Sequence, residues 1–402
     1  MTDPDRDGER TVLVAGTVVA LGTAAPGWVA VEGERIAAVG HGAPPPGGTR
    51  RDLGAGAVIV PGFVDQHVHG GAGAAFTGGD PAEALRAVQF HRAHGTTTTL
   101  ASLVAASPAE LRRDVAALTE LVADGELAGV HLEGPWLATA RCGAHDPRQL
   151  RDPDPAELAA LLATGVVRMV TLAPERAGGL EAVRRIVDAG AIAAVGHTDA
   201  SYALTREAIA AGARVGTHLF NAMAPVHHRE PGPAIALLED PRVVVELVTD
   251  GLHVHPALWR HVLAAAGPDR IAAVTDAMAA AGMPDGDYRL GALRVTVTDR
   301  VARVAGPDGA SGPIAGSTAT TADLFARLVA EARLPRAEAL AQAVALTATT
   351  PARVLGLADE VGALASGLRA DVVVLDEGAD GWLRVREVLR AGRIVEEVLP
   401  RA

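Results

Sequence analysis

Residues 57–69 read AVIVPGFVDQHVH, a run of mostly apolar, β-branched residues that ends in two histidines. Runs of this kind are typical of buried strands. On a strand, residues i and i+2 point to the same side, so we expect His67 and His69 to share one face where the strand ends. The glycines that follow allow a ligand to approach the backbone closely. The stretch therefore predicts a buried strand that delivers two candidate metal ligands.

Seven further runs of this kind follow, separated by stretches of helical period that often end in glycine. They cover residues 96–104, 129–135, 166–174, 191–199, 214–223, 243–255 and 270–278. Strands that alternate with helices are typical of βα units and a parallel sheet. Eight such units are the number that closes a (β/α)8 barrel. We therefore predict an α/β protein built on a TIM-type (β/α)8 barrel.

The two ends of the chain have a different pattern. Residues 10–55 and 361–398 contain short Val-rich runs separated by glycine and proline turns. We predict that residues 1–56 and 357–402 form one small β-sandwich domain, and that residues 57–356 form the barrel. The strand-like, Gly-rich segment 284–316 is predicted as an insertion into the barrel.

Composition excludes several classes of function. The chain has 402 residues, a formal net charge of −12 and 49% hydrophobic residues. A chain of this length and composition can bury a large hydrophobic core. A nucleic-acid-binding surface would require a basic stripe, and the negative net charge argues against one. The chain contains no lysine. This excludes a P-loop lysine, a Schiff base and a modified lysine that bridges two metal ions.

Cys142 is the only cysteine, which excludes an intrachain disulfide and a cysteine-based zinc site. The uncharged stretch 11–31 follows acidic residues and is interrupted by glycine and proline, so it resembles neither a signal peptide nor a membrane span. We therefore expect a cytoplasmic protein that binds neither membranes nor nucleic acid.

Three candidate ligands stand at the ends of three separate strands: Glu133 in HLEGP, His197 in VGHTD and His218 in GTHLFNAM. Each also has a structural interpretation, because Arg141 or a backbone donor could satisfy a buried Glu133, and either histidine could be an ordinary core residue. The ends of barrel strands converge on one face, however. A carboxylate and two imidazoles with an open position form a typical catalytic site for Zn²⁺ or a similar ion.

The H-x-H pattern of His67 and His69 is, by itself, a much less specific indication of a metal site than this set of three residues. A second copy, His253 and His255, occurs in the same chain, and His67 and His69 could form a solvated pair in a loop. Asp276 closes the eighth run, where it could cap the next helix. Its alternative role is that of a general base beside a metal-activated water.

The motifs PGFVDQHVHGG, HLEGPWL, GAHDP, VGHTDA, THLFNAM, REPG, DGLHVHP, VTDAMAAAG and AGST occur in this order between residues 61 and 318. This series resembles the N-acetylglucosamine-6-phosphate deacetylase family of the amidohydrolase superfamily. The resemblance implies that the principal metal ligands are Glu133, His197 and His218. It places Glu133 where many members of the superfamily use a modified lysine. Some members of the family lack the first H-x-H pair and hold one ion, whereas His67 and His69 are present here as candidate ligands of a second ion, so the resemblance implies one or two ions per subunit.

The resemblance further implies the roles of the remaining site residues. Asp276 matches the catalytic base, and His145 matches a residue that contacts substrate near the reacting acetamide. The implied substrate contacts also include Asn221, Ala222, Arg229 and His253. In the family the arginine at the place of Arg229 reaches in from a neighbouring subunit, which implies a homodimer. Zn²⁺ is the expected ion, with Fe²⁺, Mn²⁺ or Co²⁺ as alternatives.

We therefore expect hydrolysis of the N-acetyl group of an amino-sugar 6-phosphate, with N-acetylglucosamine 6-phosphate as the main candidate. His227 and His228 are expected to help Arg229 and His253 at the phosphate. Two departures from the family pattern bear on the choice of sugar: TATTADLF after AGST, and a long GPDGASGP stretch at 306–313. Deacetylation of the galactosamine epimer, hydrolysis of another amide and a non-catalytic binding role stay open as alternatives.

Overall fold

The computed structural model describes residues 10–306 and 311–396. The chain divides into two compact units. Unit 1 consists of Met1–Asp65, His91–Thr98 and Thr321–Ala402, and unit 2 consists of Gln66–Phe90 and Thr99–Thr320. Among the described residues, no helix has the length and apolar character needed to cross a membrane.

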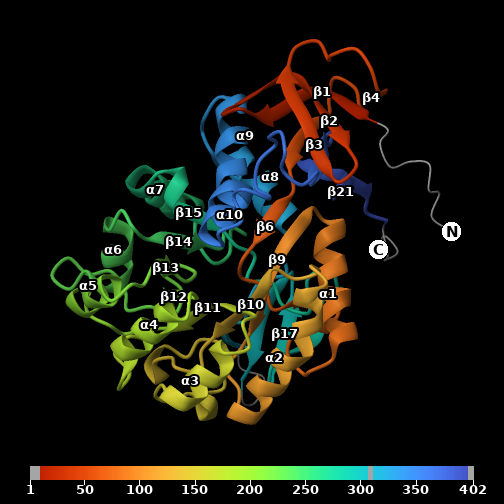
Figure 1. Cartoon of the computed structure of the whole chain (residues 1–402). Helices are drawn as coiled ribbons and strands as arrows, with labels where there is room; N and C mark the ends of the chain where they lie inside the picture. Colours follow the sequence, from red (N-terminus) through yellow and green to blue (C-terminus); the bar gives the residue numbers. More distant parts are fainter. Residues whose placement is uncertain (1–9, 307–310, 397–402) are drawn as a thin grey trace. The chain divides into compact units, whose positions relative to one another are not determined.

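The central sheet has eight strands in the order β15-β14-β13-β12-β11-β10-β9-β6, each beside its neighbour in the chain (Figure 1). Their bounds are Phe63–Asp65 (β6), Thr96–Leu103 (β9), Gly129–Glu133 (β10), Val167–Leu172 (β11), Ile192–Val195 (β12), Val215–Gly216 (β13), Val244–Leu247 (β14) and Ile271–Ala273 (β15). The segments after the first and last strands are hydrogen-bonded, because the Asp276 N–H donates to the His67 carbonyl over 2.9 Å. The predicted (β/α)8 barrel is confirmed.

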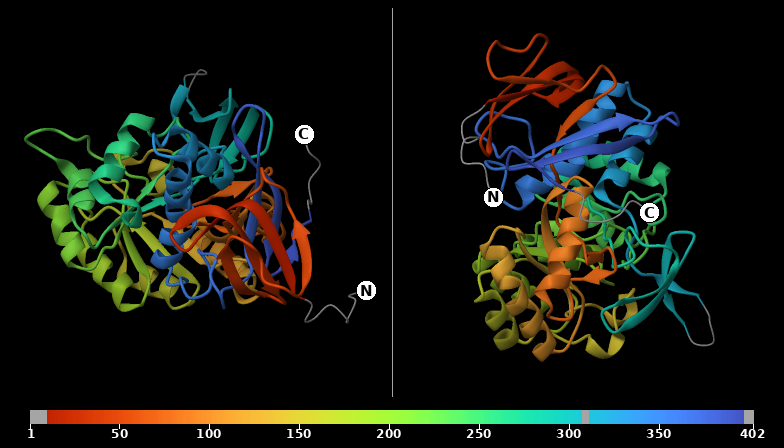
Figure 2. Two further views of the ribbon diagram at one scale, coloured as in Figure 1. Left: turned by 90° about the horizontal axis from the view of Figure 1, so that it is seen from above. Right: turned by 90° about the vertical axis from the view of Figure 1, so that its right-hand side faces the viewer.

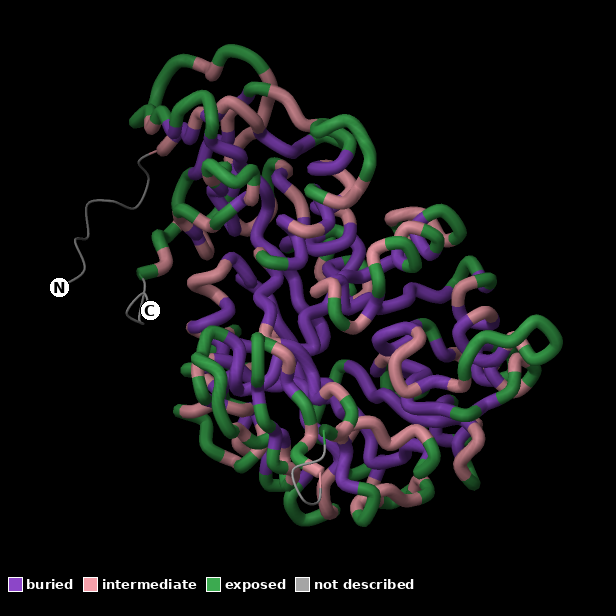
Figure 3. The backbone as a smooth tube through the Cα atoms, turned by 180° about the vertical axis from the view of Figure 1, so that it is seen from behind, coloured by how far each residue is buried: buried purple, intermediate pink, exposed green. Residues whose placement is uncertain are grey.

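Helices follow the strands as predicted. Unit 2 contains α2 to α7: Pro108–Ala123, Pro155–Leu162, Gly179–Asp188, Tyr202–Ala210, Gly232–Glu239 and Pro256–Ala266, while α1 covers Pro81–Ala93. Their starts carry local signals, such as the capping box of Ser107 and Glu110 on α2. Buried residues gather along the barrel strands and the segments that directly follow them, such as residues 66–71 and 133–138, whereas many other turns are exposed (Figure 3).

The run at 57–69 contains two strands rather than one. Its first half, β5 (Val58–Pro61), pairs with β1 and β20 of the terminal sheet, and only β6 belongs to the barrel. Gly62 separates them and donates its N–H to the Asp371 carbonyl over 2.9 Å. A Cβ atom at this position would lie 2.2 Å from Thr97 Oγ1, so only glycine fits.

Strands from the two chain ends, red to orange and blue, lie together in Figure 2. They form one mixed sheet in the order β22-β21-β20-β5-β1-β2-β3, with β4 beside β1. These strands are Thr11–Ala20 (β1), Thr23–Glu32 (β2), Arg35–His41 (β3), Thr49–Asp52 (β4), Val372–Glu377 (β20), Leu383–Arg390 (β21) and Arg393–Ile394 (β22). Their apolar core includes Leu13, Ile59 and Val372. The predicted β domain from both chain ends is confirmed. Its boundaries at 56/57 and 356/357 stay a prediction.

Unit 1 also contains the last helices, α8 (Thr321–Glu331), α9 (Arg336–Val344) and α10 (Thr350–Val354), with a π-helical turn at Ala345–Thr349. In unit 2, the strand-like segment at 284–316 forms an antiparallel sheet of β16 to β19. Its strands are Gly286–Leu290, Leu293–Thr298, Val301–Ala305 and Ser311–Ile314. The middle of the long stretch at 306–313, residues 307–310, lies outside the described residues.

Candidate metal centre

Three site residues adopt an unusual backbone conformation directly after their strands. His197, His218 and Asp276 have φ values of +45°, +27° and +49°, in the left-handed region that non-glycine residues rarely occupy. Such conformations persist only where the surrounding structure enforces them, and they are common at functional sites. Each side chain thereby turns into the mouth of the barrel after β12, β13 or β15.

The first ligand group consists of Glu133, His197 and His218, all buried. Glu133 Oε1 lies 3.1 Å from His197 Nε2 and 2.9 Å from His218 Nε2, and the two Nε2 atoms are 3.0 Å apart. The ligand atoms of the three residues lie within 4.8 Å of one another, the spacing expected around one cation. The predicted convergence of three separate strand ends is therefore present in the structure.

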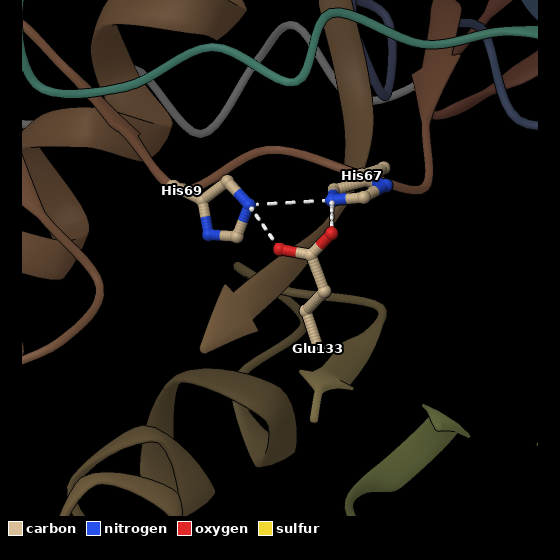
Figure 4. Close-up of side chains that lie close together, drawn as sticks. All are labelled: His67, His69 and Glu133. Atoms are coloured by element: carbon tan, nitrogen blue, oxygen red, sulfur yellow. Dashed lines mark hydrogen bonds and ion pairs between the residues drawn. The ribbon is translucent and has the colours of Figure 1, made fainter. Parts of the chain in front are cut away.

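The second ligand group shares Glu133 with the first (Figure 4). His67 Nε2 lies 3.4 Å from Glu133 Oε1, and His69 Nε2 lies 3.2 Å from Glu133 Oε2. The two Nε2 atoms are 3.2 Å apart. Both imidazoles are buried, so the interpretation of His67 and His69 as a solvated loop pair is wrong.

The ring nitrogens that face away from the centre, the Nδ1 atoms, show how these histidines are oriented. Nδ1 of His197 faces the Arg141 carbonyl at 2.8 Å, and Nδ1 of His69 faces the Ser102 carbonyl at 3.1 Å. A carbonyl only accepts, so Nδ1 carries the proton and the Nε2 lone pair of the neutral ring points to the centre. Nδ1 of His67 likewise faces an acceptor, Glu246 Oε2, at 3.0 Å, so the Nε2 lone pairs of the neutral His67 and His69 rings, 3.2 Å apart, cannot hydrogen-bond to each other. A cation between them would satisfy both, so the donor set fits a metal ion.

Negative charge at the centre favours the same conclusion. Burial alone would lower the pKa of His69, but the hydrogen bonds and charges of Asp276 and Glu133 outweigh it and raise the pKa to about 9. Burial would raise the pKa of Glu133, yet the surrounding histidines lower it well below its usual value. Carboxylates that attract a proton to His69 also attract a metal cation, whose binding releases that proton.

Within the part of the chain that the structure describes, the structural alternatives for Glu133 and Asp276 are not observed. Arg141 does not pair with Glu133, because its side chain forms a 2.8 Å ion pair with Asp199. Asp276 Oδ1 lies 3.3 Å from His69 Nε2 rather than at a helix N-terminus. Burial would raise the pKa of Asp276, but the positive charge of His67 and the hydrogen bond from His69 lower it well below its usual value. The carboxylate is therefore ionised, as a general base must be.

His145 differs from the other histidines in its protonation pattern. Its Nδ1 accepts the Ala105 N–H over 3.2 Å, so the proton of the neutral ring is on Nε2, which lies 3.2 Å from Glu133 Oε2. Burial lowers the pKa of His145 to about 4, more than Glu133 raises it. His145 is thus a neutral imidazole that presents an N–H donor to the centre.

A cavity of about 370 Å³ opens over these groups. Its lining includes His69, Glu133, His145, His197, His218, Asp276, Asn221, Ala222 and His253, together with Arg141, Leu290 and Ile314. The two histidines of the second H-x-H pair, His253 and His255, have different structural roles. His253 lines the cavity and bonds to Asp250 over 2.8 Å, whereas His255 caps α7. Burial would lower the pKa of His253, but Asp250 raises it above the usual value.

Arg229 lies outside this lining, as do His227 and His228, which were expected to help it at the phosphate. It lies with His227 and His228 on an exposed loop between β13 and α6, and its guanidinium is 2.7 Å from His228 Nε2. Its proposed contribution to a neighbouring subunit's site stays a prediction.

A buried polar layer beneath the ligands was not predicted. Glu246, Gln66, Ser102 and His131 are buried in the barrel interior, and His131 bridges Ser102 Oγ and Thr171 Oγ1 over 2.9 and 2.8 Å. A charged residue inside the apolar run VVVELV was the available signal, because a buried carboxylate must find donors.

Comparisons with known proteins agree with this geometry. Residues 58–395 match the profile described as the amidohydrolase family. N-acetylgalactosamine-6-phosphate deacetylase of Escherichia coli O157:H7 is 36% identical, over 84% of this chain and 87% of the relative. N-acetylglucosamine-6-phosphate deacetylase of Bacillus subtilis is 34% identical, over 82% and 84%.

Among solved structures, a mutant of N-acetyl-D-glucosamine-6-phosphate deacetylase from Mycobacterium smegmatis, in complex with N-acetyl-D-glucosamine 6-phosphate, is similar to this chain. It has a TM-score of 0.91 and 53% identity, over 96% of this chain and 100% of that one. The fold, the strand-end ligand groups and the sequence relatives lead to one conclusion: the chain belongs to the amidohydrolase family, within its amino-sugar 6-phosphate deacetylases.

Proposed function

We propose that this protein hydrolyses the N-acetyl group of N-acetylglucosamine 6-phosphate to give glucosamine 6-phosphate and acetate. The observation that carries the proposal is the convergence of Glu133, His197 and His218 beside Asp276 and His145 at one cavity. The 53% identity to the Mycobacterium smegmatis enzyme, whose complex contains N-acetyl-D-glucosamine 6-phosphate, supports this substrate.

Zn²⁺ is the ion that we propose for the centre, since two imidazoles, a carboxylate and an open position suit it; Fe²⁺, Mn²⁺ and Co²⁺ suit the same donors. Glu133, His197 and His218 would hold the principal ion, and His67 and His69 a second one with Glu133. A divalent ion there would polarise the acetamide carbonyl and make water more acidic.

Asp276 and His145 are suited to opposite roles in the reaction, because Asp276 can accept a proton and His145 can donate a hydrogen bond. The ionised Asp276 accepts a proton from the attacking water as oxygen adds to the acetamide carbon. It then returns the proton to the sugar nitrogen, so that the C–N bond breaks and the amine leaves beside acetate. His145, neutral with its proton on Nε2, donates a hydrogen bond to the acetamide oxygen as negative charge develops there. Water is consumed, and no other co-reactant is needed.

The sugar phosphate requires positive charge, and the chain offers guanidinium and imidazole groups for it. We propose that His253, whose pKa is raised by Asp250, faces the phosphate together with Arg229, a residue suited to paired contacts with phosphate oxygens. Asn221 and Ala222 line the cavity and would contact the sugar. Because Arg229 lies on an exposed loop outside this lining, we propose a homodimer in which it serves the neighbouring site. We also propose a cytoplasmic location, consistent with a single cysteine.

Acetate release from four substrates tests this function: N-acetylglucosamine 6-phosphate, its galactosamine epimer, and the two unphosphorylated sugars. We expect the highest kcat/KM with N-acetylglucosamine 6-phosphate and a large loss without phosphate. The 36% identity to the relative named N-acetylgalactosamine-6-phosphate deacetylase makes that epimer the second candidate. A preference for it would replace the proposed substrate, and equal rates without phosphate would contradict the role of Arg229 and His253.

A further inference from the structure

Glu246 lies on β14, fully buried, with its carboxylate in the barrel interior. It accepts hydrogen bonds from three donors. Gln66 Nε2 is 2.8 Å from Oε1, while His67 Nδ1 and the His218 backbone N–H are 3.0 and 3.3 Å from Oε2. The donors come from the ends of two other strands, β6 and β13. One buried carboxylate thereby bonds to a residue of each ligand group.

We infer that Glu246 is a positioning residue that orients His67 and fixes the His218 backbone, so that both candidate ion positions are pre-organised. The inference rests on the cation site of the proposed function. A carboxylate only accepts, so its bond with His67 places that ring's proton on Nδ1 and directs the Nε2 lone pair to the centre. Outer hydrogen bonds of this kind fix the orientation of metal-ligating histidines.

His67 differs from the other oriented ligands in depending on a side chain. The Nδ1 atoms of His69 and His197 face main-chain carbonyls, those of Ser102 and Arg141, which a substitution does not remove. His218 depends on Glu246 through the backbone, where its φ of +27° requires support. The next residue, Leu219, also donates its N–H to the Glu246 carbonyl over 2.8 Å.

Two conservative substitutions test whether Glu246 acts by orienting the ligands or only through its negative charge. Glu246→Asp retains the charge but shortens the side chain by one carbon–carbon bond, about 1.5 Å, which withdraws the acceptor from His67. Glu246→Gln retains the length and an acceptor oxygen toward His67. Its new amide N–H₂ group would face Gln66, whose side-chain oxygen has no hydrogen-bond partner among the described residues and can turn to accept it. If Glu246 acts by orienting the ligands, Glu246→Asp should therefore weaken metal binding more than Glu246→Gln does.

The experiment measures Zn²⁺ affinity and stoichiometry of the full-length protein after metal removal, by competition with a chromogenic chelator and by mass spectrometry. We expect Glu246→Asp to weaken Zn²⁺ binding about ten- to hundredfold, as loss of outer partners usually does. Glu246→Gln should lose less than Glu246→Asp. Asp114→Asn is the matched control, a buried carboxylate on α2 that bonds to Arg113 and the Gly78 N–H. It should bind Zn²⁺ as the wild type does.

Two results would overturn the inference. A larger loss in Glu246→Gln than in Glu246→Asp would mean that Glu246 acts only through its charge. Wild-type Zn²⁺ affinity in both variants would mean that it does not position the ligands. Failure of the cation site itself is distinguishable, because the wild-type protein would then bind no Zn²⁺ in the same titration.

Discussion

Replacing Asp276 with asparagine separates metal binding from proton transfer. Asparagine has nearly the same size, and the backbone bonds of this residue, from its N–H to the His67 carbonyl and from Ser317 N–H to its own carbonyl, are independent of the side chain. The substitution thus preserves the strand end but removes a group that is ionised and able to accept a proton.

The expected loss follows from the role of this carboxylate. Asp276 Oδ1 is 3.3 Å from His69 Nε2 and 3.5 Å from His67 Nε2, so a water bound between the ligands would lie within its hydrogen-bond reach. General base catalysis contributes roughly 10²- to 10⁴-fold, which corresponds to about 3 to 5 kcal/mol at 1.36 kcal/mol per factor of ten. Because Asp276 would transfer the proton twice, we expect a loss near the upper end, in kcat rather than in KM.

The assay combines acetate release with metal analysis of the same Asp276→Asn sample. We expect kcat to fall about 10³- to 10⁴-fold with unchanged Zn²⁺ content and a KM within a few-fold of the wild type. Asp240→Asn, which alters a buried carboxylate paired with Arg242, should retain the wild-type kcat. A rate within tenfold of the wild type would refute the assignment of Asp276 as base, and loss of the ion would make it a ligand instead.

The remaining predictions concern the phosphate contacts and the packing beneath the ligands. Because Asp250 raises the pKa of His253 above its ordinary value, the imidazole keeps its positive charge to a higher pH than a free histidine and loses it as pH rises through the raised pKa. KM for the phosphorylated sugar should then increase with rising pH on the alkaline side of the ordinary histidine pKa, and a flat KM would contradict this. His253→Gln should abolish the dependence. In Gly196→Ala, the added Cβ would lie 2.7 Å from Thr217 Cβ, so urea unfolding should show a loss of about 1–3 kcal/mol, and unchanged stability would be evidence against this packing. Arg229→Ala and Asp276→Asn should be inactive alone but regain activity when co-expressed as mixed dimers; no recovery would place Arg229 outside the neighbouring site.

Local pattern was sufficient for the architecture and for most of the centre. Barrel strands are parallel and buried, so each appears as an apolar run, and their ends must meet at one face. Glu133, His197, His218 and Asp276 could therefore be grouped across long separations without coordinates. The same reasoning could not tell that the run at 57–69 serves two sheets, because hydrophobic periodicity does not specify which neighbour a strand pairs with.

The sequence by itself determined the barrel, the ligand types and the family. Only the tertiary structure decided the hydrogen-bond partners: Arg141 with Asp199, the proton of His145 on Nε2, and Glu246 beneath both ligand groups. The reason is physical. Burial of apolar side chains is encoded residue by residue along the chain, whereas the partner of a buried polar group is set by distances that exist only after the barrel closes.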